Sequence, residues 1–95
     1  MRRITVVFNS IQYKRDKYED DVRYYVTWIP DSYTFSQLKT DSLDFFNLTN
    51  KKNYELQDRN GLAWKNSLQV VFAIDSTLNC NDNEIYLVKT HHRVR

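Results

Sequence analysis

The chain contains 95 residues, of which 41% are hydrophobic, 27% are charged and 15% are aromatic, and its net charge is +2. A chain of this length supports one hydrophobic core, and its aromatic content excludes a disordered segment. We therefore expect one domain over residues 1–95, ordered to about residue 90 and followed by a basic tail at 91–95. The small charge and the mixing of both signs argue against a dedicated nucleic-acid surface.

The single cysteine and the apolar runs indicate where the protein works. Cys80 has no second cysteine with which to form an internal disulfide, which favours a reducing compartment, and we expect the cytoplasm. No apolar run approaches the roughly 18 residues that a membrane span requires. We therefore expect no membrane span.

The first third of the chain predicts a β-hairpin. Residues 4–8 are β-branched or aromatic and indicate a strand, which leads into a charged stretch at 14–21 that we interpret as a turn. Residues 22–29 then set Val22, Tyr24 and Val26 against more polar alternate positions. This alternation predicts a half-buried second strand, antiparallel to the first.

The next segment predicts the main helix. Pro30 has no backbone N–H to donate and ends the second strand, and the hydroxyl and carboxylate side chains that follow suit a helix N-cap. An apolar stripe then recurs at helical spacing and predicts a helix from about residue 33 to 46. Ser42 falls on this stripe and predicts a shallow contact there.

The remaining chain predicts further strands. Residues 54–58 alternate as a strand, and the following Asn60-Gly61 pair predicts a tight turn back into a short strand at 62–64. The apolar cluster at 68–74 fits either a strand or a short helix. Residues 85–88 are all apolar or aromatic, which predicts a last strand in the middle of the sheet, covered on both faces.

This order of elements, β-β-α-β-β-β, resembles the ubiquitin-like β-grasp superfamily. Residues 30–39, PDSYTFSQLK, are similar to the strand-to-helix corner of ubiquitin, and residues 54–64, YELQDRNGLAW, resemble the Y-x-L-x-D-x-x-G-x-x-W hairpin of Ras-association and Phox/Bem adaptor domains. The resemblance implies an α+β fold with a mixed four- to five-stranded sheet packed on one main helix. The end of the chain has no Gly-Gly pair, which argues against a conjugated modifier.

The same resemblance implies a non-catalytic protein-interaction or self-assembly module, such as the head domain of a cytosolic scaffold or cytoskeletal protein. The Ras-association class binds its partner through the edge of strand two and basic residues. Surplus Tyr, Trp and Arg side chains also favour a protein interface. The predicted partner is another protein or a second copy, and the predicted binding residues are Lys14, Arg15, Arg23, Tyr24 and Tyr25.

Two other function classes compete with this hypothesis. The basic first hairpin carries several tyrosines and suits a small nucleic-acid-binding or phage-type regulatory protein. An enzyme has less support, because Cys80 lies beside a negative neighbour and because His91 and His92, adjacent in the chain, would point to opposite faces of a strand. We expect no catalytic, cofactor or metal site and no small-molecule substrate.

Overall fold

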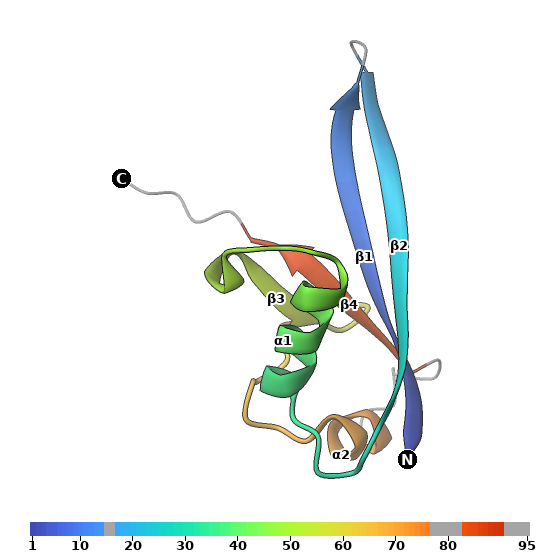
Figure 1. The fold of residues 1–95 in the computed structure, drawn as a ribbon. Coiled ribbons are helices and arrows are strands. Elements are labelled where there is room, and N and C mark those ends of the chain that lie inside the picture. Colours follow the sequence, from blue (N-terminus) through green and yellow to red (C-terminus); the bar gives the residue numbers. More distant parts are fainter. Residues whose placement is uncertain (15–16, 77–82, 91–95) are drawn as a thin grey trace.

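The computed structural model describes residues 1–14, 17–76 and 83–90, and in this part of the chain four strands form one mixed sheet (Figure 1). The strand order is β2-β1-β4-β3. β1 is antiparallel to β2 and parallel to β4, and β3 is antiparallel to β4. With the main helix α1 on one face of the sheet, the fold is α+β, as the sequence predicts. The elements are β1 (Arg2–Lys14), β2 (Lys17–Ile29), α1 (Phe35–Phe45), a 3-10 turn (Lys51–Asn53), β3 (Tyr54–Gln57), α2 (Val70–Asp75) and β4 (Glu84–Lys89).

The first hairpin is longer than the sequence predicts. Most of the charged stretch predicted as a turn at 14–21 belongs to the strands, because β1 pairs with β2 from Arg2–Ile29 to Lys14–Lys17, and residues 15 and 16 lie outside the described part of the chain. The backbone groups of a two-stranded ribbon pair across the ladder or bind water, so charged side chains are tolerated there without a core beneath them. β4 pairs with β1 only up to Phe8, so the far half of the hairpin projects beyond the rest of the sheet (Figure 1).

The helix α1 begins where the sequence places it. Thr34 is the N-cap, and its hydroxyl accepts from the Gln37 backbone N–H at 3.3 Å while the Gln37 side chain accepts from the Thr34 backbone N–H at 2.9 Å. This capping box satisfies two amides at the helix start. Ser42 is fully buried, so the shallow contact predicted there is wrong. Phe45, in contrast, is largely exposed.

The chain after β3 turns back antiparallel as predicted, because the Asp58 N–H donates to the Leu62 carbonyl at 2.9 Å and the Trp64 N–H donates to the Leu56 carbonyl at 2.8 Å. The Asp58 carboxylate accepts from the backbone N–H groups of Asn60 at 2.8 Å and Leu62 at 3.0 Å, and only Gly61 in this loop has a positive φ, at 85°. The predicted strand at 62–64 is one isolated bridge between Gln57 and Ala63. The Gly61 N–H donates to the Asp58 carbonyl at 3.1 Å, so the turn centres on Arg59 and Asn60, and the expected two-residue Asn-Gly turn is not formed.

The last third of the chain supplies the second helix and the central strand. The cluster at 68–74 forms the short helix α2 from Val70 to Asp75, which settles the alternative that the sequence left open. β4 lies between β1 and β3, as its apolar sequence predicts, but only one of its faces is fully covered, because Tyr86 and Val88 on the other face are half-buried. The parallel pairing of β1 with β4 joins the two ends of the described chain in one sheet.

The core fills the space between one face of the sheet and the two helices. We call this face the inner face and the opposite one the outer face. One buried cluster contains Val6, Phe35, Leu38, Leu56 and Leu87, among others. The ring of Phe35 also stacks on Trp64 at 4.9 Å, which fixes the loop after β3 against the helix.

Candidate functional site

The predicted binding residues do not lie on one surface. Lys14 ends β1, Arg15 lies outside the described residues, and the other three follow one another in β2. Successive residues of a strand point to opposite faces. Tyr24 is therefore on the outer face, whereas Arg23 and Tyr25 are on the inner face.

The two faces of β2 are the reverse of what its alternation predicts. Phe8 and Val6 are buried on the inner face, and the residues opposite them in the ladder are Arg23 and Tyr25. Ile29, at the end of the strand, is also buried on this side. The more apolar set is left in solvent on the outer face, and we call it the β2 row: Val22 is 43% exposed, Tyr24 59%, Val26 47% and Trp28 62%.

The backbone groups of the β2 row point away from the sheet. Thr5 donates its backbone N–H to the Asn83 carbonyl at 3.1 Å, on the β4 side of β1 and away from β2. In an antiparallel ladder, two opposite residues both turn their backbone groups toward each other or both turn them away. Val26 lies opposite Thr5, so its N–H and C=O point to the far edge of β2, and the rest of the β2 row follows by alternation.

This far edge is open in the described part of the chain. β2 is the end strand of the sheet, with β1 on one side and no described strand on the other. An edge strand presents unpaired N–H and C=O groups that can pair with another chain. In β2 the unpaired backbone groups and the exposed apolar side chains belong to the same residues.

The outer face around the β2 row has no helix over it among the described residues. Val7 of β1 and Tyr86 of β4 continue this apolar surface across the outer face toward the middle of the sheet, and both are half-buried. Arg3 lies opposite Trp28 at one end of the row, and Asp20 of β2 lies at the other end, and both are exposed. The row is thus apolar in the middle, basic at one end and acidic at the other.

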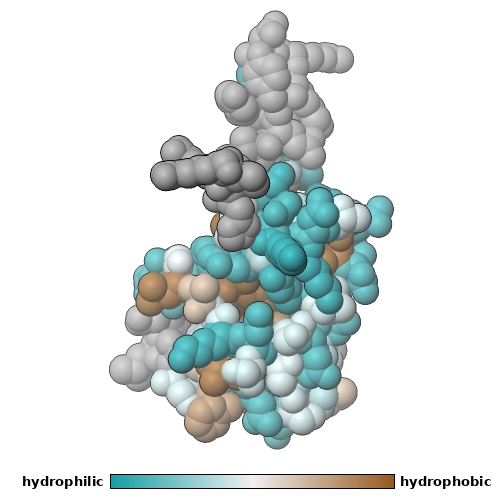
Figure 2. Space-filling view, turned by 90° about the vertical axis from the view of Figure 1, so that its left-hand side faces the viewer, coloured by the Kyte–Doolittle hydropathy of each residue, from teal (hydrophilic) through white to brown (hydrophobic). Residues whose placement is uncertain are grey.

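The opposite side of the molecule has a different character. In the view of Figure 2, hydrophilic side chains interrupt the apolar ones over the described body, so the apolar patches are small and separated. Burial in the core accounts for most apolar side chains of the helices and of β3. Small separate patches are ordinary on soluble proteins, whereas a continuous apolar row on an open edge is not.

On the inner face, Arg23 and Tyr25 cover the edge of the core. The Tyr25 ring stacks on Phe45 of α1, with centroids 4.4 Å apart. The Arg23 guanidinium carbon lies 5.4 Å from the Phe8 ring centre and 5.8 Å from that of Phe46. Its Nε is buried without a hydrogen-bond partner among the described residues, and it lies 3.6 Å from the Asp21 carboxylate, too far for a hydrogen bond.

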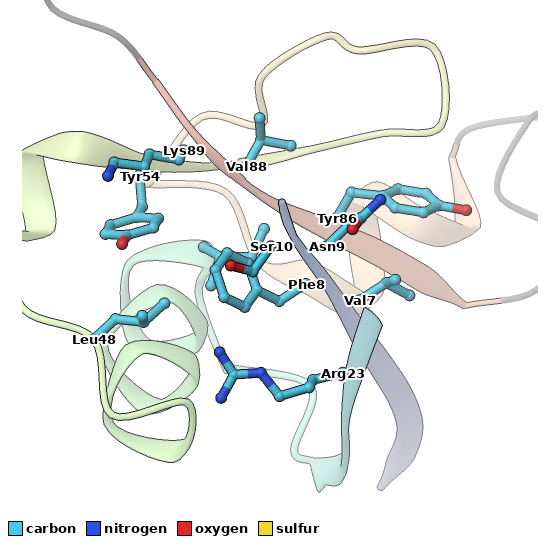
Figure 3. A pocket seen from close by; sticks show the side chains of 11 residues that line it. Val7, Phe8, Asn9, Ser10, Arg23, Leu48, Tyr54, Tyr86, Val88 and Lys89 are labelled. Atoms are coloured by element: carbon cyan, nitrogen blue, oxygen red, sulfur yellow. The ribbon is translucent and has the colours of Figure 1, made fainter. Parts of the chain in front are cut away.

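Arg23 also lines a hollow of about 670 Å³ where β1 and β4 separate beyond their last paired residues. Figure 3 shows the guanidinium beneath the Phe8 ring, with Leu48 to one side. The lining is mainly apolar and aromatic, with Asn9, Ser10 and Lys89 as its other polar members. The guanidinium packs on aromatic rings here, so we assign it a role in closing the core edge.

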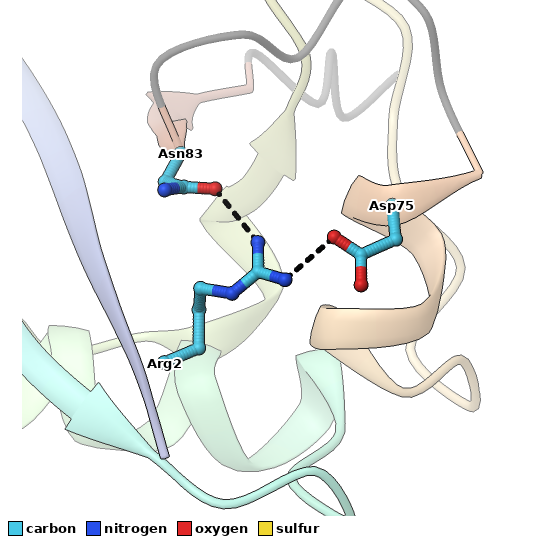
Figure 4. Close-up of polar contacts among 3 residues, drawn as sticks. All are labelled: Arg2, Asp75 and Asn83. Atoms are coloured by element: carbon cyan, nitrogen blue, oxygen red, sulfur yellow. Dashed lines mark hydrogen bonds and ion pairs between the residues drawn. The ribbon is translucent and has the colours of Figure 1, made fainter.

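The side chain of Arg2, at the start of β1, binds two residues far along the chain. Arg2 donates to Asp75 at 2.7 Å and to the Asn83 side chain at 3.2 Å (Figure 4). Because the Arg2 and Asp75 side chains are 33% and 54% exposed, water screens this ion pair, and it positions β1 more than it stabilises the fold.

Tyr86 lies on the outer face, where its phenol is partly covered. Burial raises the pKa of its phenol, and the hydrogen bond that it donates to Glu84 at 3.0 Å raises the pKa further. The neutral phenol is therefore favoured in the folded protein. No group of three His, Cys, Asp or Glu side chains gathers to hold a metal ion in the described ranges, and no helix there is long and apolar enough to cross a membrane.

No model of a known protein family matches the chain, and no curated protein matches it. The β2 row is a candidate interaction surface of which the sequence predicts only Tyr24 as a binding residue, although its apolar alternation is visible in the sequence. Arg3 and Asp20, at the two ends of the row, were likewise not assigned to it. The signal for this surface is the row of four apolar residues at alternate positions of an edge strand that has only one covered face.

Proposed function

We propose that this chain is a divergent ubiquitin-like β-grasp domain that works as a non-catalytic protein-interaction module. In this proposal the partner adds a strand to the open edge of β2. The partner strand pairs with the outward backbone groups of the β2 row, and its side chains pack on the same row. Main-chain hydrogen bonds then supply affinity, and alternate side chains supply specificity.

The order and pairing of the elements support the β-grasp assignment. A hairpin is followed by one main helix, then β3, and the last strand returns to the middle of the sheet beside β1. The helix begins after Pro30, at the corner that resembles that of ubiquitin. After β3 the chain pairs through one bridge, Gln57–Ala63, where a five-stranded β-grasp sheet would have a full strand.

The observation that carries the interaction proposal is the coincidence of two properties in the β2 row. Side chains of Val, Tyr and Trp are exposed there, and the same residues direct unpaired N–H and C=O groups outward. Either property alone is common on protein surfaces. Together they offer a partner strand both a backbone ladder and an apolar face.

The charges near the β2 row favour a protein over a nucleic acid. Binding to a phosphate backbone requires several basic groups that release counterions. The row itself is uncharged, and the exposed charges beside it are of both signs, from Arg3 at one end to Asp20 at the other. A protein strand with apolar and mixed-charge side chains matches this surface better than a polyanion does.

The proposal includes a cytoplasmic setting, as the head domain of a scaffold or cytoskeletal protein. It rests on the single cysteine and on the adaptor class that the sequence resembles. The interaction surface does not depend on this setting.

A capture experiment with matched variants tests the interaction proposal. The immobilised domain is exposed to cell extract, and bound proteins are quantified by mass spectrometry for wild type, Val26→Pro and Leu62→Lys. Val26→Pro removes one outward N–H, whereas Leu62 is 68% exposed in the loop after β3. We expect specific partners to bind wild type and Leu62→Lys and to be lost with Val26→Pro. The same partners on all three would contradict the proposal.

A further inference from the structure

We propose that the strand added to β2 is the β2 of a second copy of this chain, paired antiparallel around a twofold axis at Tyr25. This inference rests on the proposed function, because it names the partner of the same edge. In such a pair the same surface of both copies forms the contact, so the β2 row must be complementary to itself.

The sequence of the β2 row has this self-complementarity. With the axis at Tyr25, Tyr24 lies opposite the partner's Val26, and Val22 lies opposite the partner's Trp28. The twofold axis repeats both pairs, so every member of the row faces another member. Each pair joins an aromatic to a β-branched side chain, a combination that stabilises cross-strand contacts.

The backbone directions permit this register. Tyr24 and Val26 both turn their N–H and C=O groups toward the open edge, as do Val22 and Trp28. They would therefore form the hydrogen-bonded pairs of the new ladder, while Tyr25 at the axis keeps its own bonds to β1. An axis at Tyr24 also matches the backbone, but it would set Asp20 opposite the partner's Trp28. The axis at Tyr25 leaves no charged residue opposite an apolar one within the row.

The charges at the two ends of the row are complementary as well. Asp20 lies beyond Val22 at one end, and Arg3 lies beside Trp28 at the other, all on the outer face. Antiparallel pairing brings the acidic end of one copy to the basic end of its partner. Complementary charges at an interface favour the correct register over shifted ones.

The geometry also closes the assembly at two copies. Both β2 edges are used in the contact, so the joined sheet of eight described strands ends at the β3 strand of each copy. β3 has only four residues, and Gln57 at its end already bridges to Ala63. Short edges of this kind resist further strand addition. Pairing through β2 therefore yields a dimer and no fibre.

Sedimentation equilibrium between about 10 μM and 1 mM tests whether the chain pairs with itself. We expect wild type and the control Leu62→Lys to reach the mass of two chains. Two variants separate backbone from side chain at one position: Val26→Ala shortens the side chain, and Val26→Pro also removes the outward N–H. We expect Val26→Pro to raise the dissociation constant by at least about a hundredfold, and Val26→Ala to raise it by less. Dimers that persist unchanged in Val26→Pro would overturn the inference.

Nuclear Overhauser contacts in a sample that mixes isotope-labelled and unlabelled chains test the register. With the axis at Tyr25, Arg23 and the partner's Thr27 form a pair without hydrogen bonds, whose α-protons lie close together. Within one chain these residues lie opposite Phe8 and Ile4, so a contact between their α-protons comes only from a dimer. We expect this intermolecular contact. A contact between Arg23 and the partner's Tyr25 in its place would overturn the axis at Tyr25.

A wild-type chain that stays monomeric up to about 1 mM would overturn self-pairing. The capture experiment then decides the proposed function separately. Partners lost with Val26→Pro would leave the interaction module standing with a different occupant, and the absence of such partners would remove both proposals.

Discussion

Thr5 and Val26 lie opposite each other in the β1–β2 ladder, and Thr5 donates its backbone N–H away from Val26 to the Asn83 carbonyl. This one hydrogen bond determines the backbone direction of every residue in β2. It separates the strand into residues that hold β1 and residues that face the open edge. The same division separates the core-facing side chains from the β2 row.

Proline substitutions at neighbouring positions of β2 should have unequal effects on folding. Tyr25→Pro removes an N–H that bonds to β1, whereas Val26→Pro removes one that points to the open edge. We expect Tyr25→Pro to lower the free energy of unfolding by about 1–3 kcal/mol more than Val26→Pro does, because a carbonyl of β1 loses its donor. Urea denaturation of the two variants in dilute solution measures this difference. Equal losses of unfolding free energy would mean that the assigned directions of the two N–H groups are wrong.

The buried hydroxyl of Ser42 predicts an unusual response to its removal. Its Oγ is buried without a hydrogen-bond partner among the described residues, on the core face of α1. A buried polar atom without a partner costs about 1–3 kcal/mol, and Ala also favours a helix more than Ser does. We expect Ser42→Ala to raise the free energy of unfolding or leave it unchanged in chemical denaturation. A loss above about 1 kcal/mol would mean that the hydroxyl has a partner.

Truncation of Leu38 tests the contact between α1 and the sheet. Leu38 is fully buried in the core cluster. We expect Leu38→Ala to lower the free energy of unfolding by about 2–5 kcal/mol, because it removes buried methyl groups and leaves a cavity. The control Asp44→Ala, on the exposed side of the same helix, should change it by less than about 0.5 kcal/mol. If Leu38→Ala melted like the wild type, the helix would present a different face to the core.

Tyr86 predicts a specific loss of stability at alkaline pH. Burial and the bond to Glu84 raise the pKa of its phenol above the unfolded value near 10.0. The folded state then holds the proton more tightly, so this contribution is complete below pH 10 and is lost as the pH rises through the folded pKa. Thermal melts at increasing alkaline pH should show a smaller decline for Tyr86→Phe than for wild type. A parallel decline of both proteins would show that Tyr86 titrates as it does in the unfolded chain.

The sequence predicts the elements whose ends carry local chemical signals. Pro30 and the Thr34 cap determine where β2 ends and α1 begins, and the alternation of β3 and the apolar run of β4 mark both strands. These signals act over a few residues and need no knowledge of the rest of the fold. The return of the chain after β3 is also predicted, but the turn centres on Arg59 and Asn60 instead of Asn60 and Gly61, and the Asp58 side chain binds two of its amides.

The sequence does not predict which face of β2 is covered. Hydrophobic alternation identifies the more apolar face of a strand, but the position of the helix decides which face is buried. In β2 the helix side is occupied by Arg23 and Tyr25, whose long side chains pack over Phe8 and Phe45. The binding residues were therefore assigned to one surface although they belong to two. The mismatch between apolar character and burial is also the feature that identifies the interaction surface.

Residue-resolved amide hydrogen exchange along β2 tests the open edge most directly. In dilute solution we expect the amides of Arg23, Tyr25 and Thr27 to be protected at least about tenfold more than those of the β2 row. At concentrations that populate the bound state, the amides of the row should become protected as well. Equal protection of the two sets in dilute solution would contradict the account, because the edge of β2 would then already be paired.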